Sequence, residues 1–319
     1  MRYKPSVNIF IFTILLFSSS CEKEITIETP DMQDKLVVHS TFRPFTTPYV
    51  KDFQVQLTDS RSILDNRKFD TIAGAEICLF EDNKILDTLN YIDSLGIYQC
   101  DEFPESGKEY RIQAKKKGYP EIIASDRVPS KIIVNSIEVD TVAFRDDMGS
   151  YYSRITISLR DPGNNKNYYE IRVKSAGGDR FWDISTNDIS IVNERYYPSQ
   201  LDPGFEYPSR LLFTDNRFDG ERKQVSFFFS PAQYIEFENN NKVRYYYDQI
   251  IQIYFRSVSK KYYLYYTSLL EKLDNQEGDI LYGMAEPLEV PSNIRGGYGI
   301  FAGYQVDIKQ FRIREQRVN

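Results

Sequence analysis

The sequence is poor in the residue types that most catalytic and metal sites use. Its 319 residues include one histidine, three cysteines and one tryptophan. A Ser-His-Asp or Cys-His arrangement would need His39, but His39 lies in the alternating stretch KLVVHST and no G-x-S-x-G motif occurs, so a strand residue is the simpler interpretation. One histidine and two cysteines in strand-like runs give no zinc-ligand spacing. The composition therefore predicts a protein that is not an enzyme and uses no cofactor or metal ion.

Two short motifs resemble catalytic or metal signatures but lack the partners that such sites need. Residues 257–260 (SVSK) match S-x-x-K without its S-D-N and K-T-G companions. Residues 215–220 (DNRFDG) resemble a calcium loop, but Arg217 stands where a ligand oxygen is required, so we predict a tight turn. A hydrolase built on a carboxylate pair such as Asp146 and Asp147 is the least favoured alternative.

The sequence also lacks a hydrophobic run long enough to cross a membrane. The apolar run at residues 7–17 (VNIFIFTILLF) has signal-peptide length, and Arg2 and Lys4 precede it. Three serines and Cys21 follow in an order that resembles a lipobox, although Ser18 stands where most lipoboxes have leucine. Alanine is absent from the first 20 residues, which disfavours the alternative of an ordinary secretory cleavage site. We predict a lipoprotein signal peptide over residues 1–20, a lipid on Cys21 and a polar tether over residues 21–34.

Basic clusters are scarce as well. Lys115 to Lys117 form the only basic run, and a solvated strand end before a Gly-Tyr-Pro turn explains it. Without the signal peptide the formal net charge of −6 becomes about −8, because Arg2 and Lys4 are removed. This charge disfavours nucleic acid and anionic lipid surfaces as partners. The membrane contact that we predict is therefore the N-terminal lipid.

Short β-rich runs separated by turn signals fill the rest of the chain. The mature chain of about 300 residues exceeds what one core usually organises, which favours two domains. Runs such as KLVVHSTF and YRIQAKK precede Pro129, and runs such as SRITISLRD and DQIIQIYFRSV follow it. We predict a mainly β protein with two β-sandwiches of the immunoglobulin or transthyretin-like kind, over residues 35–130 and 131–319. A tyrosine-rich helix over residues 259–273 (SKKYYLYYTSLLEKL) is expected to pack on the second sandwich.

Two strand-like runs each contain one cysteine, Cys78 in AEICLF and Cys100 in GIYQC. An export route allows a disulfide between them if the two strands are neighbours with facing side chains. Two buried free thiols are the alternative, and the sequence leaves both open.

The long, proline-punctuated stretch 177–210 is the candidate binding segment. Strand periodicity does not explain its aromatic residues, and rigid aromatic rings and arginines are frequent in binding hot spots. It is either a binding loop or a structural flap. The candidate binding residues are Trp182, Tyr196, Tyr197, Tyr207 and Arg195, with Arg180 and Arg210 in the same stretch.

Four D-[S/T]-apolar tripeptides resemble the O-glycosylation sites of exported Bacteroidetes proteins. Strand-edge Asp-Thr pairs in turns are an equally good interpretation. The candidate acceptors are Thr71, Thr88, Ser94 and Thr141.

Three segments together resemble one known family. Residues 73–129 look like a transthyretin-like or carboxypeptidase-regulatory-like β domain. LRDPGNNKNYYEIRV with FTDNRFDGERKQVSF is the second segment, and the run from the tyrosine-rich helix through Glu286-Pro287 to PSNIRGGYGIFAGYQVD is the third and most specific. The resemblance is to the lipoproteins catalogued as domain-of-unknown-function family forty-two forty-nine, which are typically encoded beside TonB-dependent outer-membrane receptors. It implies an accessory role in nutrient uptake and carries no catalytic residue with it.

From the residues themselves, the glycines of the third segment predict close backbone approaches or bulges in a strand. Contact of Ser292, Asn293 and Arg295 with a partner is the alternative. We expect a ligand-binding or receptor-docking lipoprotein, with a structural or adhesive surface lipoprotein as the runner-up. The tract Glu22-Lys23-Glu24 resembles the signal that sends Bacteroidetes lipoproteins to the cell surface, which favours the outer face of the outer membrane.

Overall fold

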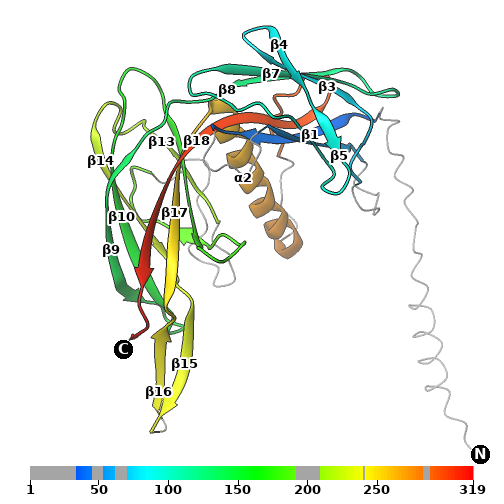
Figure 1. The fold of residues 1–319 in the computed structure, drawn as a ribbon. Helices are drawn as coiled ribbons and strands as arrows, with labels where there is room; N and C mark the ends of the chain where they lie inside the picture. The colour runs from blue at the N-terminus through cyan, green and yellow to red at the C-terminus, as the bar shows by residue number, and fades with distance from the viewer. Residues whose placement is uncertain are drawn as a thin grey trace, which may run out of the picture. The chain divides into compact units, whose positions relative to one another are not determined.

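The computed structural model describes residues 34–44, 53–61, 70–191, 209–239, 241–282 and 288–318, with helix side chains up to residue 273. This part of the chain is mainly β with one helix, as the sequence predicts (Figure 1). The first strands are β1 (Leu36–Phe42), β2 (Gln54–Asp59), β3 (Glu76–Glu81), β4 (Lys84–Thr88), β5 (Asn90–Ile92), β6 (Ile97–Gln99), β7 (Glu109–Lys115) and β8 (Ile122–Arg127). The later elements are β9 (Val134–Arg145), β10 (Tyr151–Arg160), β11 (Tyr168–Ser175), β12 (Ile184–Ser185), β13 (Leu211–Thr214), β14 (Arg222–Phe229), β15 (Gln233–Glu238), β16 (Asn241–Tyr246), β17 (Gln249–Val258), α2 (Lys260–Tyr282), β18 (Tyr298–Ile313) and β19 (Gln316–Arg317).

Alternation of buried and exposed side chains explains why these segments are strands. In β7 the side chains of Tyr110, Ile112 and Ala114 are buried while the residues between them face outward. β10 repeats the pattern with Ile155, Ile157 and Leu159. Successive side chains of a strand point to opposite faces, so each strand buries one side against a core.

The strands form one large sheet and three smaller ones. The large sheet has eight strands in the order β13-β11-β17-β18-β1-β2-β6-β5. The smaller sheets have the orders β4-β3-β7-β8, β12-β14-β10-β9 and β15-β16-β19. The large sheet is therefore built from strands of both halves of the chain.

Two apolar cores lie on one side of the large sheet. The first core joins β1, β2 and β6 to β3, β7 and β8, with Phe42, Phe53 and Tyr110 in edge or tilted ring contacts. The second joins β11, β17 and β13 to β10, β12 and β14 around Tyr169 and Phe227. Each core is that of a β-sandwich, which confirms the predicted fold class.

β18 belongs to both sandwiches. Its residues Tyr298–Gly303 pair with β1 in parallel, and Tyr304–Ile313 pair with β17 in antiparallel fashion (Figure 1). Ile294 and Phe301 are consequently part of the first core, although they come from the segment 131–319 that the sequence assigns to the second sandwich. The N-terminal sandwich thus includes the last long strand of the chain.

The glycine-rich segment before and within β18 is a packing motif. A Cβ on Gly299 would lie 1.9 Å from the carbonyl oxygen of Val38, and the φ of Gly299 is +102°. A Cβ on Gly303 would lie 2.8 Å from the carbonyl oxygen of Arg127. The amide of Asn293 donates to the Phe301 carbonyl at 2.7 Å and accepts from the Phe301 N–H at 3.0 Å. These contacts agree with the close backbone approaches that the sequence predicts.

The helix α2 packs on the other side of the large sheet. It begins at Lys260, close to the expected position, but continues to Tyr282, beyond the predicted end at residue 273. Tyr262, Tyr263 and Tyr266 form a third apolar cluster with Val258 of β17 and with Ile300 and Ala302 of β18. None of the described helices is long and apolar enough to cross a membrane.

Candidate functional site

A fully buried carboxylate lies under α2. Glu170 of β11 has no exposed surface. Its Oε2 is 2.7 Å from Nη1 of Arg256 and accepts the Tyr262 hydroxyl at 3.0 Å. Its Oε1 lies 3.0 Å from Nη1 of Arg210, without the alignment of a hydrogen bond. A buried charge needs partners of this kind, because its desolvation is otherwise too costly.

The register of the large sheet brings these side chains together. Glu170 pairs with Arg256 on β17 and with Leu212 on β13. Arg172 points to the same face as Glu170, two residues further along β11. Because Ile171 pairs with Leu211, the same antiparallel register places Arg172 opposite Arg210. One face of β11 and β17, together with the residue just before β13, thus carries three arginines and one glutamate.

Aromatic rings hold the planes of all three guanidinium groups. Arg210 lies 4.0 Å from the centroid of the Tyr266 ring, and Arg172 lies 3.5 Å from that of Phe181. Arg256 lies 4.8 Å from the ring of Tyr304. Arginine stacks well on aromatic faces, which leaves its N–H groups available in the plane. We call Glu170, Arg172, Arg210, Arg256, Tyr262, Tyr266 and Tyr304 the arginine–tyrosine cluster.

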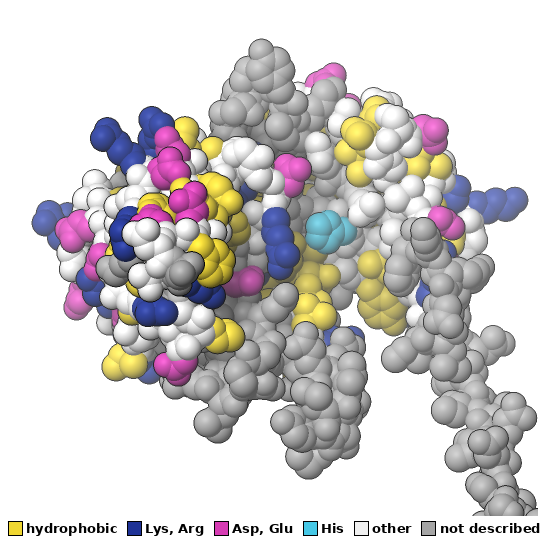
Figure 2. Space-filling view, turned by 90° about the horizontal axis from the view of Figure 1, so that it is seen from below, with side chains coloured by type: hydrophobic (Ala, Val, Ile, Leu, Met, Phe, Trp, Pro, Cys, Tyr) yellow, Lys and Arg dark blue, Asp and Glu magenta, His cyan; other side chains and the backbone are white. Residues whose placement is uncertain are grey.

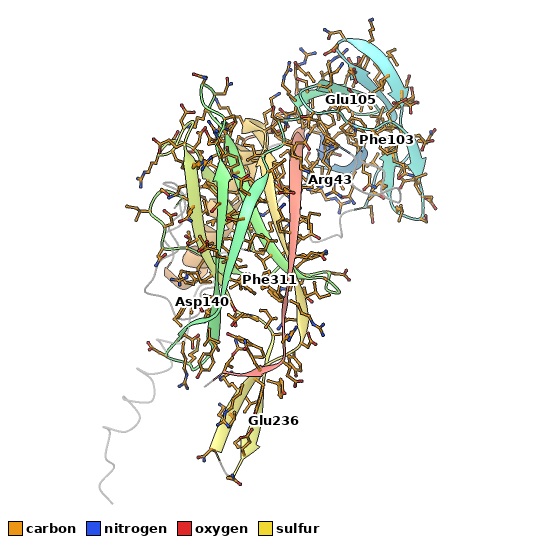
Figure 3. The ribbon with its side chains drawn as sticks, turned by 60° about the vertical axis from the view of Figure 1, so that its left-hand side comes forward. Arg43, Phe103, Glu105, Asp140, Glu236 and Phe311 are labelled. Atoms are coloured by element: carbon orange, nitrogen blue, oxygen red, sulfur yellow. The ribbon has the colours of Figure 1, made fainter. Side chains whose placement is uncertain are left out.

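His39 of β1 and Arg43, the residue that follows β1, border this cluster. Nε2 of His39 lies 3.4 Å from the hydroxyl of Tyr266. The guanidinium of Arg43, labelled in Figure 3, lies 5.9 Å from the Tyr304 ring. In Figure 2 the single histidine (cyan) lies at the surface, with basic (dark blue) and hydrophobic (yellow) side chains near it. The cluster therefore borders solvent at the β1 side.

Positive charge exceeds negative charge in the cluster. Burial alone would raise the pKa of Glu170, but Arg256, Arg210 and Arg172 together bring it below its usual value. Burial, and then the charge of Arg210, lower the pKa of Arg172 to about 10. Partial burial and Arg210 likewise lower the pKa of His39. The negative charge of Glu170 is thus shared among three arginines, and any additional positive charge at this place is disfavoured.

Several arginine N–H groups of the cluster have no hydrogen-bond acceptor among the described residues. Arg172 uses Nε and Nη2 on Ser209, and Nη1 has no acceptor there. Nε of Arg256 is buried without an acceptor, and Nη1 of Arg210 has only the misaligned Glu170 oxygen. Unsatisfied donors beside excess positive charge form an arrangement suited to binding an oxyanion.

A second charged cluster consists of Asp161, Asp215 and Asp219, whose carboxylate oxygens lie within 4.8 Å of one another. Asp161 accepts the Gly220 N–H at 2.9 Å, and Asp215 accepts the Asn167 N–H at 2.7 Å. Asp161 also accepts the hydroxyl of Tyr169. The two loops lie close together, because a Cβ on Gly163 would be 3.1 Å from the Gly220 Cα. These bonds tie the β10–β11 loop to the tight turn predicted at residues 215–220.

The candidate binding segment is only partly described. Trp182 stacks on Phe229 at 5.5 Å between ring centroids, and its backbone N–H donates to the Val173 carbonyl at 2.8 Å. It packs against the second core, so this part of the segment is structural. Arg210 lies in the arginine–tyrosine cluster instead. The other candidates, Arg195, Tyr196, Tyr197 and Tyr207, lie outside the described residues.

The disulfide that the sequence allows between Cys78 and Cys100 is not formed. Both cysteines are free thiols in the structure. Cys100 points into the first core, whereas Cys78 is half-exposed between the buried Ile77 and Leu79 on β3. The Cys100 side chain therefore lies inside the first sandwich, whereas the Cys78 side chain lies on its outer face. Burial raises the pKa of the Cys100 thiol to about 11, which keeps it protonated and unreactive.

The four candidate glycosylation sites differ in accessibility. Thr88 and Ser94 are exposed. Thr71 and Thr141 are half-buried, with Thr71 Oγ1 3.1 Å from the Tyr91 hydroxyl and Thr141 Oγ1 accepting from Gln316 at 3.2 Å. Modification of all four stays a prediction, and glycopeptide mapping in the native host would test it.

Sequence reasoning did not find the arginine–tyrosine cluster. Its only local signal is Glu170 in YYEIRV, where the residues directly before and after it, Tyr169 and Ile171, are aromatic and apolar. The partners Arg210 and Arg256 are distant in the sequence, so only the strand pairing reveals them. Tyr262 and Tyr266 were expected to pack as part of an apolar helix stripe, and they do so while the hydroxyl of Tyr262 donates to Glu170 and that of Tyr266 lies beside His39.

The described structure defines a two-sandwich β protein with a buried charged cluster under one helix. The chain belongs to the family described as Domain of unknown function (DUF4249), whose model matches residues 22–310. No curated protein matches it. A solved structure described as "Putative membrane anchored protein" from Corynebacterium diphtheriae is 13% identical, with a TM-score of 0.19. That match covers 72% of this chain and 55% of the other, and the low TM-score gives it no weight for the fold.

Proposed function

We propose that the protein is a lipid-anchored lipoprotein of the outer membrane that serves as a non-enzymatic accessory or ligand-binding component of a TonB-dependent nutrient uptake system. The arginine–tyrosine cluster is the observation that carries the binding role. It offers oriented hydrogen-bond donors and aromatic faces, which are the groups of a recognition site. The lipobox-like order around Cys21 supports a lipid anchor. The typical position of the family's genes, beside those of TonB-dependent receptors, supports such a receptor as the partner.

The anchor is tested by Cys21→Ala. We expect the variant to move from the membrane fraction to the soluble fraction, because the lipid is the only apolar anchor expected in the mature chain. Cys78→Ala is the matched control, since it removes a half-exposed thiol far from the N-terminus and should stay in the membrane fraction. Mass spectrometry of the N-terminal peptide reports the lipid. Membrane retention of Cys21→Ala, with no acylated peptide in the unmodified chain, would contradict the proposal.

The uptake role is tested by mild solubilisation and affinity capture of the tagged, lipidated protein from its native host. We expect a TonB-dependent receptor among the captured outer-membrane proteins, and slower growth on the receptor's nutrient when the protein is deleted. Capture of attachment or secretion components without a receptor would favour the structural or adhesive alternative. A lack of receptor capture together with unchanged growth would end the uptake proposal.

A further inference from the structure

The register that pairs Ile171 with Leu211 places Arg172 opposite Arg210, the residue just before β13, and, next to burial, the charge of Arg210 helps to lower the pKa of Arg172. Directly opposed side chains on paired strands have Cβ atoms about 5 Å apart, and like charges at such a position are destabilising. Glu170 is in ion-pair contact with Arg210 and Arg256, whereas it acts on Arg172 only through its charge at longer range. Glu170 offsets only part of this repulsion, because its single negative charge is shared with Arg256 and two positive charges remain in excess.

Both guanidinium groups are nevertheless held in fixed orientations. Arg172 is clamped between the Phe181 ring and the backbone carbonyl of Ser209, to which its Nε donates at 3.2 Å. Arg210 is stacked on Tyr266 and placed beside Glu170. A side chain held against repulsion loses little further entropy when a ligand binds, which is the condition called preorganisation.

We propose that the Arg172–Arg210 pair binds an oxyanion, a carboxylate or phosphate group of a small ligand. The N–H edges of the two guanidinium groups match the planar or tetrahedral oxygens of such a group. Glu170 and Arg256 are positioning residues in this site, because they hold Arg210 and the sheet face in place. This proposal rests on the proposed function, because it names the chemical class of the ligand that the binding protein would take.

The site differs from a general basic patch. The protein as a whole is acidic, with a net charge of −6, so nonspecific attraction does not bring anions to it. A local excess of two positive charges, partly buried under α2, has stronger interactions than the same charges in water. Anion binding at this place is therefore selective for a group that fits between the two arginines.

The test measures thermal unfolding of the full lipidated protein in detergent with inorganic phosphate, sulfate or citrate, against chloride at equal ionic strength. We expect at least one oxyanion to raise the Tm with saturation, and Arg172→Gln to weaken its apparent affinity at least tenfold. A response to phosphate alone would indicate a ligand with a phosphate group, and a response to citrate alone would indicate a ligand with carboxylates. Arg172→Gln should also raise the Tm of the anion-free protein, because it removes the repulsion.

Lys174→Gln is the matched control. Lys174 lies on the same face of β11, next to the same Phe181 ring at 5.6 Å, and carries the same charge, but it is outside the pair. It should leave the anion response unchanged. The proposal is overturned if no oxyanion exceeds chloride, if both variants respond alike, or if Arg172→Gln lowers the anion-free Tm and keeps the response. Receptor capture with Arg172→Gln is a separate readout, so loss of anion binding with retained capture is distinguishable from failure of the uptake role.

Discussion

At the residue scale, the fold contains a buried carboxylate whose charge must be compensated by its neighbours. Glu170 is completely buried and compensates the charge of Arg256 on β17 and of Arg210 just before β13. Removing one partner of a buried ion pair leaves the other charge without compensation, which is far worse than losing a surface pair.

Glu170→Gln should therefore lower the free energy of unfolding by about 3 kcal/mol or more, the range seen when one partner of a buried pair is removed. Glu109→Gln is the control, because Glu109 is exposed and lies 3.6 Å from an exposed Arg127. The control should change the stability by less than about 0.5 kcal/mol. Chemical denaturation at neutral pH measures both. Equal, small effects would show that the carboxylate is not the centre of the cluster.

Acidification should destabilise the protein through both titratable groups of this region. Glu170 has a folded pKa below its usual value of about 4.5, so its contribution is present above that pH and is lost as the pH falls through the folded pKa. His39 has a folded pKa below 6.5, so the unfolded chain takes up its proton first and stability already falls below pH 6.5. His39→Gln should flatten the curve of stability against pH between those two values. An unchanged slope in that variant would show that His39 does not contribute.

Trp182 was expected to bind a partner, and its packing leads to a different expectation. Trp182→Ala should lower the free energy of unfolding by about 2 kcal/mol, because the ring is stacked on Phe229 at the edge of the second core. Phe237→Ala is the control, since that ring is 76% exposed and its loss should be nearly neutral. Retained stability in Trp182→Ala with weakened receptor binding would restore the binding role.

At the scale of elements, the sequence predicts what alternation alone determines. The strands β7 and β10 follow from their buried periodicity, and α2 follows from its tyrosine and leucine stripe. The end of α2 was predicted too early because the apolar stripe stops near residue 273 while the helix continues to Tyr282. The strand pairings, and with them the arginine–tyrosine cluster, could not be predicted, because periodicity says which face is buried but not which strand lies beside it.

The close contact of β18 with β1 at Gly299 can be tested by substitution. Gly299→Ala should lower the free energy of unfolding by more than about 3 kcal/mol or prevent folding, because the added Cβ meets the Val38 carbonyl and φ is positive. Gly118→Ala is the control, with a φ of +91° and nothing within 4 Å of the added Cβ. It carries only the backbone strain, about 1 kcal/mol. Similar losses in the two variants would mean that strain, and not the close approach, explains the glycine.

At the scale of the whole molecule, the two predicted sandwiches are joined by a shared strand. Residues 34–130 lack β18, and with it the partner of β1 and the core side chains Ile294 and Phe301. Asp126 of the first sandwich also accepts the Gly303 N–H at 2.9 Å. Pro129, which divides the two series of strand-like runs in the sequence, does not divide the chain into two parts that can each complete a core.

A fragment of residues 34–130 should therefore be largely unfolded, with weak amide protection in hydrogen exchange. Addition of a synthetic peptide covering residues 288–304 should increase the protection of β1 and β8, whereas the same peptide with Gly299→Ala should not. The intact chain should unfold in one cooperative transition that involves both cores. A stable, protected fragment without the peptide would show that the first sandwich is independent.

The parallel pairing of Val37 with Tyr298 also constrains the order in which the protein can be made. The ribosome makes β1 long before β18, so β1 has no parallel neighbour until β18 has been synthesised. Such distant pairings are slow to close and delay completion of the fold. A chain that cannot complete its large sheet until β18 has been made stays unfolded for longer during synthesis, and an unfolded chain is what an export channel for unfolded polypeptides would require.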